Sequence, residues 1–305
     1  MYSIENKKIL LLGGTGFLGN ALIAFLVKEN VNIYLLARNA SNRKDLQKYK
    51  SNSNIKIFDW YLSDIEIIEK VIKEVDCVIN LCGILYENIK GDFYKIHSDF
   101  PSTLAELCSK NNITNFIHVS ALGVSETSES KYSRSKASGD RRLLEQFPMA
   151  KILRPSLLYG KGDNFFGQFS DMASISPVIP LISKNTKFQP IFVNDVVSAI
   201  IKLITNKDIK GNIFDLGGKF AYTFESLLKI LFDIKGIKRF FIPLNPNLMM
   251  IPALFLERLP KPPFTVDQMK LLKHDNILNG NYPGLNELGI EPADMEEELT
   301  KIYSK

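Results

Sequence analysis

A tyrosine and a lysine four residues apart are well placed for acid–base catalysis. Tyr132 and Lys136 frame the segment Tyr132-Ser133-Arg134-Ser135-Lys136, and this spacing puts both on one face of a helix. An ammonium group near a phenol lowers the tyrosine pKa, so Tyr132 is suited to carbonyl–alcohol interconversion. Ser120 ends an apolar segment twelve residues earlier, where its hydroxyl could hold the same substrate oxygen. Taken alone, the Tyr–Lys spacing also fits an ordinary exposed helix turn.

Glycines three residues apart near the start of the chain indicate a phosphate-binding turn. Gly13, Gly16 and Gly19 lie between a predicted strand and a predicted helix. Gly13 would permit the tight turn, Gly16 the approach of a pyrophosphate, and Gly19 close packing of the helix, whose N-terminus faces the anion. The alternative is an ordinary glycine-rich turn, but the strand–turn–helix context favours dinucleotide binding. The residues predicted to bind are Gly13, Thr15, Gly16, Phe17, Leu18 and Gly19.

The end of the second predicted strand indicates which dinucleotide binds. An acidic residue there would bind a ribose 2′-hydroxyl, whereas this strand ends in Arg38, with Arg43 and Lys44 close behind. Arginine suits a 2′-phosphate, so NADPH is favoured over NAD, although a solvated charge is the alternative. Asp59 is expected near the adenine amino group. Leu81, Cys82 and Gly83 are expected beside the ribose and nicotinamide, unless they are simple turn residues.

The first half alternates apolar runs with amphipathic stretches, which predicts an α/β fold with a Rossmann-type doubly wound parallel sheet. Predicted strands are Lys8–Leu12, Asn32–Ala37, Ile55–Phe58, Asp76–Cys82, Asn115–Ser120, Ala150–Leu153 and Ile213–Leu216. Predicted helices are Gly16–Glu29, Phe93–Lys110, Lys131–Gln146, Asn194–Thr205 (with Asn194 as a cap) and Phe224–Asp233. From about Pro243 we expect helix and loop.

The regular alternation of apolar runs and amphipathic stretches ends after Arg154-Pro155. Beyond this point glycines and prolines separate short segments. We therefore expect a dinucleotide-binding domain over residues 1–155 and a smaller C-terminal substrate-side region over 156–305. The two are expected to be interleaved, with 190–218 returning to the Rossmann sheet.

The composition argues against a nucleic-acid-binding protein, a metalloprotein and a disulfide-linked protein. The chain has 305 residues and a net charge of +5, far from the dense basic stripe of a nucleic-acid binder. Its three cysteines and three histidines form no metal-binding pattern, so we expect neither a metal nor disulfides, and a reducing compartment. The polar N-terminus shows no targeting signal, which favours a cytoplasmic protein.

The segment 240–256 is unusually apolar. Pro243, Pro246 and Pro252 interrupt it too often for a transmembrane helix. Basic residues flank it: Lys235, Lys238 and Arg239 before, Arg258 and Lys261 after. One interpretation is burial of one helix face in the core of the second half. The other is docking to a membrane surface or to a hydrophobic partner subunit.

Several motifs together resemble an extended or atypical short-chain dehydrogenase/reductase. They are the glycine turn, His118-Val119-Ser120-Ala121, Tyr132–Lys136, Arg154–Gly160, Phe192–Val196 and Phe214–Gly218. Over nearly the whole chain the sequence is most similar to the branch of the NADPH-binding accessory subunit of respiratory complex I. That similarity is carried by the short Ser120–Tyr132 interval, Ile179–Leu181, Asn281–Leu285 and Leu288–Ile290.

The resemblance implies a tightly held NADPH and a role that is often structural. It implies Ser120, Tyr132 and Lys136 as the catalytic trio, with Tyr132, Lys136 and Pro155 also at the cofactor. The chain departs from the family where extended members carry an asparagine, because His97 stands there. The twelve-residue Ser–Tyr interval is also shorter than in sugar-nucleotide epimerases.

Three functions follow as hypotheses. The first is an accessory or assembly factor for respiratory complex I or ubiquinone metabolism, with largely structural NADPH and with complex I subunits or quinone-biosynthesis proteins as partners. The second is an active NADPH-dependent reductase on an apolar carbonyl or quinone-related substrate. The third, weaker because of the short loop, is a nucleotide-sugar epimerase or dehydratase. We expect the protein in the cytoplasm, with peripheral contact of 240–256 at the inner face of the cytoplasmic membrane.

Overall fold

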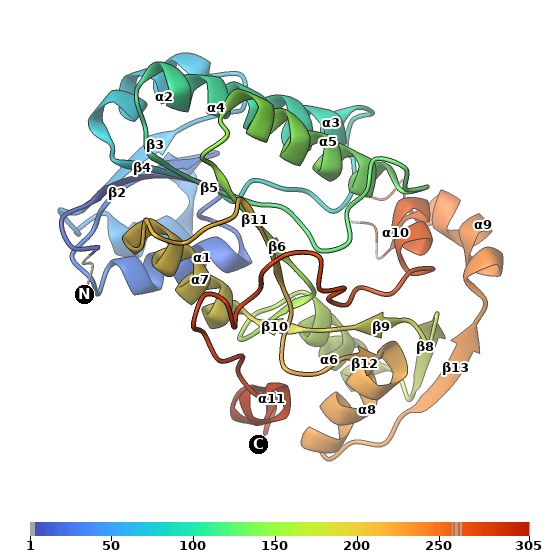
Figure 1. Ribbon diagram of the computed structural model, residues 1–305. Coiled ribbons are helices and arrows are strands. Elements are labelled where there is room, and N and C mark those ends of the chain that lie inside the picture. Colours follow the sequence, from blue (N-terminus) through green and yellow to red (C-terminus); the bar gives the residue numbers. More distant parts are fainter. Residues whose placement is uncertain (1–3, 258, 260–261, 263, 305) are drawn as a thin grey trace. The chain divides into compact units, whose positions relative to one another are not determined.

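A seven-stranded parallel sheet organises the chain, as the computed structural model shows for residues 4–257, 259, 262 and 264–304 (Figure 1). Its order is β11-β6-β5-β4-β1-β2-β3, so β1 lies at the switch point between β4 and β2. The strands are β1 Lys8–Leu12, β2 Asn32–Ala37, β3 Ile55–Asp59, β4 Cys77–Asn80, β5 Asn115–Val119, β6 Lys151–Pro155 and β11 Ile213–Leu216. The predicted Rossmann-type sheet is thereby confirmed.

Helices cover both faces of this sheet (Figure 1). On one face lie α2 Ile65–Val71, α4 Phe100–Lys110 and α5 Lys131–Gln146, and on the other α1 Phe17–Leu26 and α7 Val193–Thr205. Because both faces are covered, the central strands are almost continuously apolar and fully buried, as in β1 and β4. The single tryptophan, Trp60, is buried in the core on the α2–α4 side.

The helix predicted over Phe93–Lys110 contains a local change of winding. A short α3, Asp92–Tyr94, leads into a π-helical turn over Lys95–Asp99 before α4 begins. This turn lies against α5, where a Cβ at Gly139 would stand 1.8 Å from the carbonyl oxygen of His97. Only a glycine therefore permits the observed approach of α5 to the π-helical turn.

The chain divides into two compact units. Unit 1 contains the residues up to Ser120, Ser135–Arg154 and Val196–Phe214, and unit 2 contains Ala121–Arg134, Pro155–Asp195 and the chain from Asp215 onward. Unit 2 carries three strand pairs: β7 Leu158–Tyr159 with β10 Ile191–Phe192, β9 Lys187–Phe188 with β12 Tyr222–Thr223, and β8 Val178–Ile182 with β13 Phe240–Leu244. Its helices are α6 Phe165–Ile175, α8 Phe224–Ile234, α9 Pro246–Leu256, α10 Val266–Leu271 and α11 Met295–Tyr303.

Two hydrophobic clusters form the core of unit 2, and the larger of them is rich in aromatic residues. The larger packs α6 and α8 around Phe166, Phe224 and Tyr159, with edge-on ring contacts such as that of Tyr159 with Phe166. The smaller joins α9 and α10 through Ala253 and Met269.

Several predicted boundaries are wrong. The expectation of helix and loop from Pro243 fails because Phe240–Leu244 forms β13, paired on one side only with β8, where a proline is tolerated. The first helix ends at Leu26 instead of Glu29, and Asn194 lies inside α7 instead of capping it. Asp76, Leu81, Cys82 and Ser120 flank strands β4 and β5 without belonging to them.

The contact at Gly139 yields a stability prediction. Gly139→Ala should lower the free energy of unfolding by about 1–3 kcal/mol, because the new methyl group overlaps the His97 carbonyl and forces α5 outward. Gly167→Ala is the matched control, since a Cβ there meets its nearest atom, the Tyr303 hydroxyl, only at 4.0 Å. A helical alanine at that position should raise stability by about 0.5–1 kcal/mol. Urea unfolding of both variants measures this, and equal stabilisation by the two would contradict the close packing.

Candidate functional site

The glycine turn joins β1 to α1 at the carboxyl edge of the sheet in unit 1. Gly13 has a φ of +76°, and a Cβ there would lie 2.7 Å from the carbonyl carbon of Leu81 and 2.8 Å from the nitrogen of Cys82. Its carbonyl accepts a hydrogen bond of 3.1 Å from the Gly16 amide. The prediction that Gly13 makes a tight turn is therefore confirmed, and the reason includes a close approach to the chain after β4.

The other glycines show how the turn is packed. A Cβ at Gly19 would lie 2.4 Å from the Cα of Gly14, so Gly19 lets α1 pack on the turn itself. The Asn20 side chain, which sequence reasoning missed, donates to the carbonyls of Gly16 at 2.9 Å and Thr15 at 3.3 Å. In the described structure no side chain caps Gly16, so the first amides of α1 are available to an anion.

Arg38 lies directly after β2, exposed at the same edge. The register pairs Ala37 with Asp59, which places Asp59 beside this strand end. The Ser41 hydroxyl donates to Asp59 at 3.4 Å, and Asn39 between them adopts a left-handed conformation. Arg38, Ser41 and Asp59 thus form one polar group at the end of β2 and β3.

Arg38, Arg43 and Lys44 differ in whether a carboxylate pairs with them. Arg43 makes a two-pronged contact with Asp45, with bonds of 2.6 and 3.0 Å. This pairing lowers the Asp45 pKa and occupies the guanidinium. Arg38 and Lys44, in contrast, take part in no ion pair among the residues that the structure describes.

A buried asparagine fixes the bend after β4. Asn80 is fully buried; its Oδ1 accepts from the Cys82 amide at 3.0 Å and its Nδ2 lies 3.1 Å from Nδ1 of His118. Because the amide nitrogen can only donate, His118 accepts through Nδ1. Asn80 therefore holds the peptide of Cys82 where Gly13 meets it, a role hidden in the sequence inside an apolar run.

His97 links the loop after β4 to α5. Its Nε2 accepts from the Ile84 amide at 3.0 Å, and its Nδ1 lies 2.9 Å from the Ser135 hydroxyl. Burial lowers the His97 pKa to about 2, so the ring is neutral and donates through Nδ1. His97 is thus a fixed, uncharged connector between this loop and α5.

Lys136 lies buried beside this connector. Its Nζ donates to the Val119 carbonyl at 3.1 Å, and a Cβ at Gly83 would stand 3.4 Å from it. Burial lowers the Lys136 pKa to about 8, opposed by the charge of Asp140. The lysine ammonium therefore lies between the ends of β4 and β5, where the nicotinamide ribose was predicted.

A buried ion pair follows Lys136 one turn along α5. Asp140 accepts from Arg154 Nε at 2.8 Å, and its other oxygen lies 4.0 Å from Nε2 of His118. Burial raises the Asp140 pKa, while Arg154 opposes the rise. This pair ties α5 to β6 within unit 1.

An acidic side chain from α10 caps the first turn of α5. The Asp267 carboxylate accepts from the Lys131 amide at 2.7 Å, the Ser130 hydroxyl at 2.7 Å and the Tyr132 amide at 3.1 Å. No local sequence pattern indicates this cap, because more than 130 residues separate the partners. Asp267 thereby holds the start of α5, whose second residue is Tyr132.

Most of the predicted site residues lie in unit 1, and two of them belong to unit 2. The glycine turn, Arg38, Asp59, Leu81–Gly83, Ser120 and Lys136 lie at the carboxyl edge of unit 1. Ser120 is buried directly after β5, and its amide donates to the Leu153 carbonyl at 2.8 Å. Tyr132 and Pro155 belong to unit 2, with Tyr132 four residues before Lys136 on α5.

Two segments of the second half that carried the resemblance meet in unit 2. The Asp215 amide donates to the Pro283 carbonyl at 3.0 Å, and the Gln189 side chain bridges Gly218 and Leu278. Around them lies a pocket of about 430 Å³.

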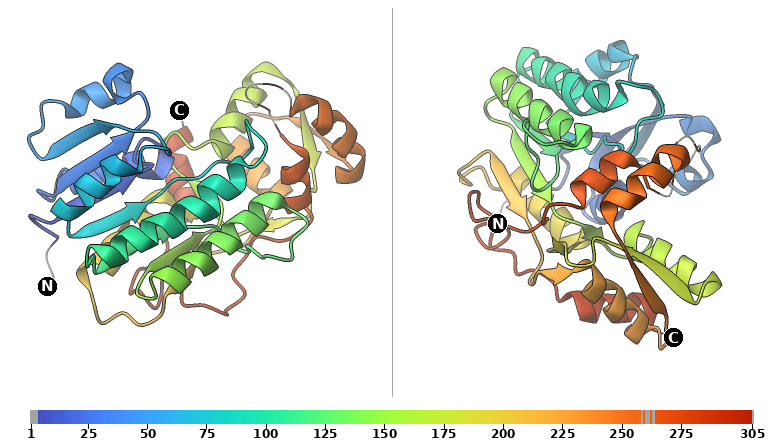
Figure 2. Two further views of the ribbon diagram at one scale, coloured as in Figure 1. Left: turned by 90° about the horizontal axis from the view of Figure 1, so that it is seen from above. Right: turned by 90° about the vertical axis from the view of Figure 1, so that its right-hand side faces the viewer.

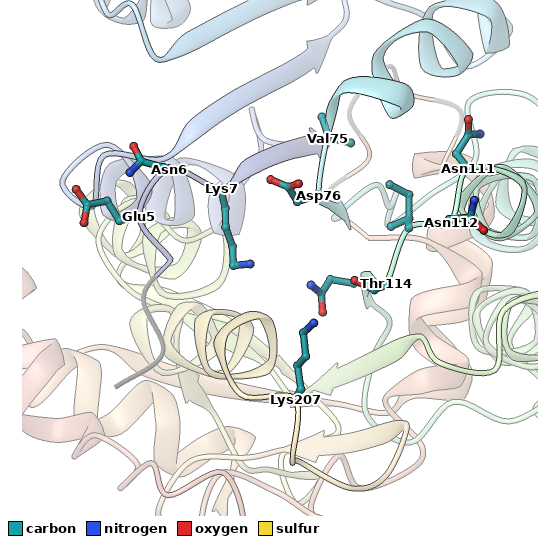
Figure 3. Close-up of a pocket in the computed structure, with 11 residues that line it drawn as sticks. Glu5, Asn6, Lys7, Val75, Asp76, Asn111, Asn112, Thr114 and Lys207 are labelled. Carbon is teal, nitrogen blue, oxygen red and sulfur yellow. The ribbon is translucent and has the colours of Figure 1, made fainter.

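A second pocket of about 430 Å³ lies at the opposite, amino edge of the unit 1 sheet (Figure 3). It opens before β1, β4 and β5, and the side chains of Lys7 and Lys207 point into it. It contains none of the predicted cofactor residues.

The family description "NAD dependent epimerase/dehydratase family" matches residues 9–217. The chain belongs to this family. The match covers the glycine turn, Ser120, Tyr132 and Lys136, and so confirms the resemblance to extended short-chain dehydrogenases/reductases. With it comes the general expectation of an NAD-type cofactor for this family.

Known relatives are similar over most of the chain. The mitochondrial "NADH dehydrogenase [ubiquinone] 1 alpha subcomplex subunit 9" of Mus musculus is 29% identical over 99% of this chain and 81% of its own. The "Ceramide reductase" of Caulobacter vibrioides is 25% identical over 63% of this chain and 59% of its own. Among solved structures, a nucleoside-diphosphate-sugar epimerase from Staphylococcus aureus superposes with a TM-score of 0.75 at 15% identity, over 96% of this chain and 99% of its own, which shows the shared fold.

The buried lysine predicts a pH dependence of stability. Because the pKa of Lys136 falls from 10.5 to about 8 on folding, the unfolded chain binds more protons between these values. The lysine's contribution to the free energy of unfolding therefore rises with pH over this window and is constant below it. Relative to Lys136→Met, the wild type should gain on the order of 1 kcal/mol between about pH 7.5 and about pH 10 in urea unfolding.

Comparing the two proteins at each pH cancels the exposed lysines and the buried thiols, which titrate in both. A stability difference that stays constant across this range would contradict a lysine with a lowered pKa.

Proposed function

We propose that this protein is an NADPH-binding accessory or assembly factor of respiratory complex I, with the dinucleotide mainly stabilising the fold. The observation that carries the proposal is the similarity to the complex I subunit over 99% of this chain. A ligand bound only by the native state adds stability in proportion to the logarithm of its concentration over Kd. The proposed partners are complex I subunits, at the inner face of the membrane. A role in ubiquinone metabolism, with quinone-biosynthesis partners, stays a prediction.

The geometry of unit 1 supports dinucleotide binding. The uncapped start of α1 offers amides to the pyrophosphate, and Arg38 offers a cation to the 2′-phosphate. When bound, the dinucleotide would supply hydride chemistry at its nicotinamide. Lys136 would hydrogen-bond the nicotinamide ribose, and Asp59 the adenine amino group.

In the described part of the chain, no helix has the length and hydropathy needed to cross a membrane.

An active reductase is the second candidate. The retention of Ser120, Tyr132 and Lys136, together with the similarity to a ceramide reductase, favours an apolar carbonyl substrate. Tyr132 would deliver the proton, Lys136 would favour its phenolate, and Ser120 would bind the substrate oxygen. The neutral His97 cannot relay a charge at physiological pH, but its contact with Ser135 orients the helix that carries both groups.

Cofactor preference tests the first part of the proposal. Arg38→Gln should weaken NADPH binding about tenfold or more while leaving NADH binding nearly unchanged, because only NADPH carries the 2′-phosphate. Arg43→Gln is the matched control, since Asp45 already holds that guanidinium. Isothermal titration measures both. A wild type that binds NADH more tightly than NADPH would overturn the assignment of NADPH.

The variant Tyr132→Phe distinguishes the two candidate functions. Tyr132→Phe removes the proton donor, so a reductase would lose turnover by about 10²-fold or more while cofactor stays bound. An accessory factor with structural NADPH would keep both its thermal stability and its co-purification with complex I subunits. Affinity purification from membranes, followed by a respiration assay, measures the difference. Recovery without any respiratory subunit would count against the accessory role.

A further inference from the structure

Helix α9 presents a row of large apolar side chains to solvent. Leu248, Ile251, Leu254 and Phe255 are 73%, 68%, 50% and 64% exposed. Their spacing of three and four residues places them on one side of the helix, which we call the α9 face. Such a concentration of exposed apolar residues is uncommon on a soluble protein without a partner.

The opposite side of α9 is covered. Ala253 is fully buried, and Met249 and Met250 pack with it in the cluster that contains Met269 of α10. Figure 2 shows α9 and α10 side by side. The helix is therefore apolar on both sides, but unit 2 uses only one of them, so the α9 face is not explained by the local core.

Strand β13 extends the apolar surface. Phe240 and Ile242 alternate on its outward side and are 75% and 49% exposed. Asn245 directly follows β13 and caps α9 by accepting from the Asn247 amide at 2.9 Å, so it is the single residue between the two elements. The apolar surface thus runs from Phe240 to Phe255.

Basic residues outnumber acidic residues in the segment that contains this surface. Between Asp233 and Glu257 the chain carries Lys235, Lys238 and Arg239 and no carboxylate. Residues 233–267 contain five basic residues and three acidic residues (Asp233, Glu257 and Asp267), so the net charge of this segment is +2. Two of the basic residues, Arg258 and Lys261, lie outside the described residues.

The dimensions exclude a transmembrane role for α9. Its eleven residues span about 16 Å, roughly half of a bilayer's hydrocarbon core. A short helix with an apolar face and basic neighbours instead suits the plane of a membrane interface, where apolar side chains enter the acyl region and cations meet phosphates.

We propose that the α9 face and the outward side of β13 dock this protein on the surface of an anionic phospholipid bilayer. The apolar side chains supply the insertion and the positive charge of the segment selects the anionic lipid. This docking is independent of dinucleotide binding at unit 1, so either can fail without the other.

Vesicle flotation of the full-length protein tests the proposal. The wild type should bind vesicles of phosphatidylcholine with about one-third phosphatidylglycerol at least about tenfold more tightly than pure phosphatidylcholine. The double variant Ile251→Asp/Phe255→Asp should lose about tenfold or more of this binding, because it places two carboxylates on the α9 face. Met149→Asp is the matched control: it changes a side chain that is 57% exposed in unit 1 and should leave binding unchanged.

Depth of insertion provides a second readout. In Phe255→Trp the new indole should shift its emission to the blue on anionic vesicles and be quenched by brominated acyl chains, whereas Trp60, only 4% exposed, supplies a constant background. NADPH titration of every variant shows that unit 1 is intact.

Equal binding to neutral and anionic vesicles, or full binding by the double variant, would overturn the proposal. So would a double variant that keeps vesicle binding but no longer co-purifies with respiratory subunits, because the α9 face would then belong to a protein partner.

Discussion

The contact between the turn after β1 and the chain after β4 is the constraint on which the candidate site depends. These two strands are neighbours at the switch point of the sheet, and their continuations must separate within a few residues. They do so with the backbone of Gly13 lying directly on the peptide between Leu81 and Cys82. The buried Asn80 side chain holds that peptide in place. The turn that would bind pyrophosphate is thus positioned by backbone contacts, which vary little with side-chain motion.

Helix α5 is the second element that the site requires, and different interactions hold each part of it. Asp267 fixes its first turn, the glycine contact at Gly139 fixes its distance from the π-helical turn, and the Asp140–Arg154 pair ties it to β6. Lys136 lies among these attachments. Burial of the lysine costs stability, and the surrounding attachments compensate by preventing the helix from moving its ammonium group into water.

The features that depend on neighbouring residues in the chain were predicted from the sequence. The bounds of α5 and the order of strand and helix through the first half follow from hydrophobic periodicity, and the glycine spacing identified the turn. Asn80 and Asp267 were missed because their roles come from partners far along the chain. Strand β13 was missed because Pro243 signals loop, and only its one-sided pairing with β8 makes the proline acceptable. The predicted site residues were found from motifs, whereas the groups that hold them in place required the structure.

The three cysteines have a consequence for the chemistry that this protein can survive. Burial raises the pKa of Cys77 and Cys82 to about 12 and that of Cys108 also well above its usual range. The thiolate is the form that peroxides attack, so a raised pKa lowers the reactivity of each thiol at neutral pH. Cys82, whose backbone nitrogen lies against Gly13, is half-buried, and its raised pKa makes it less reactive toward peroxides than an ordinary thiol. The chain that packs against the Gly13 turn is therefore less open to oxidation than an ordinary thiol at this position would make it.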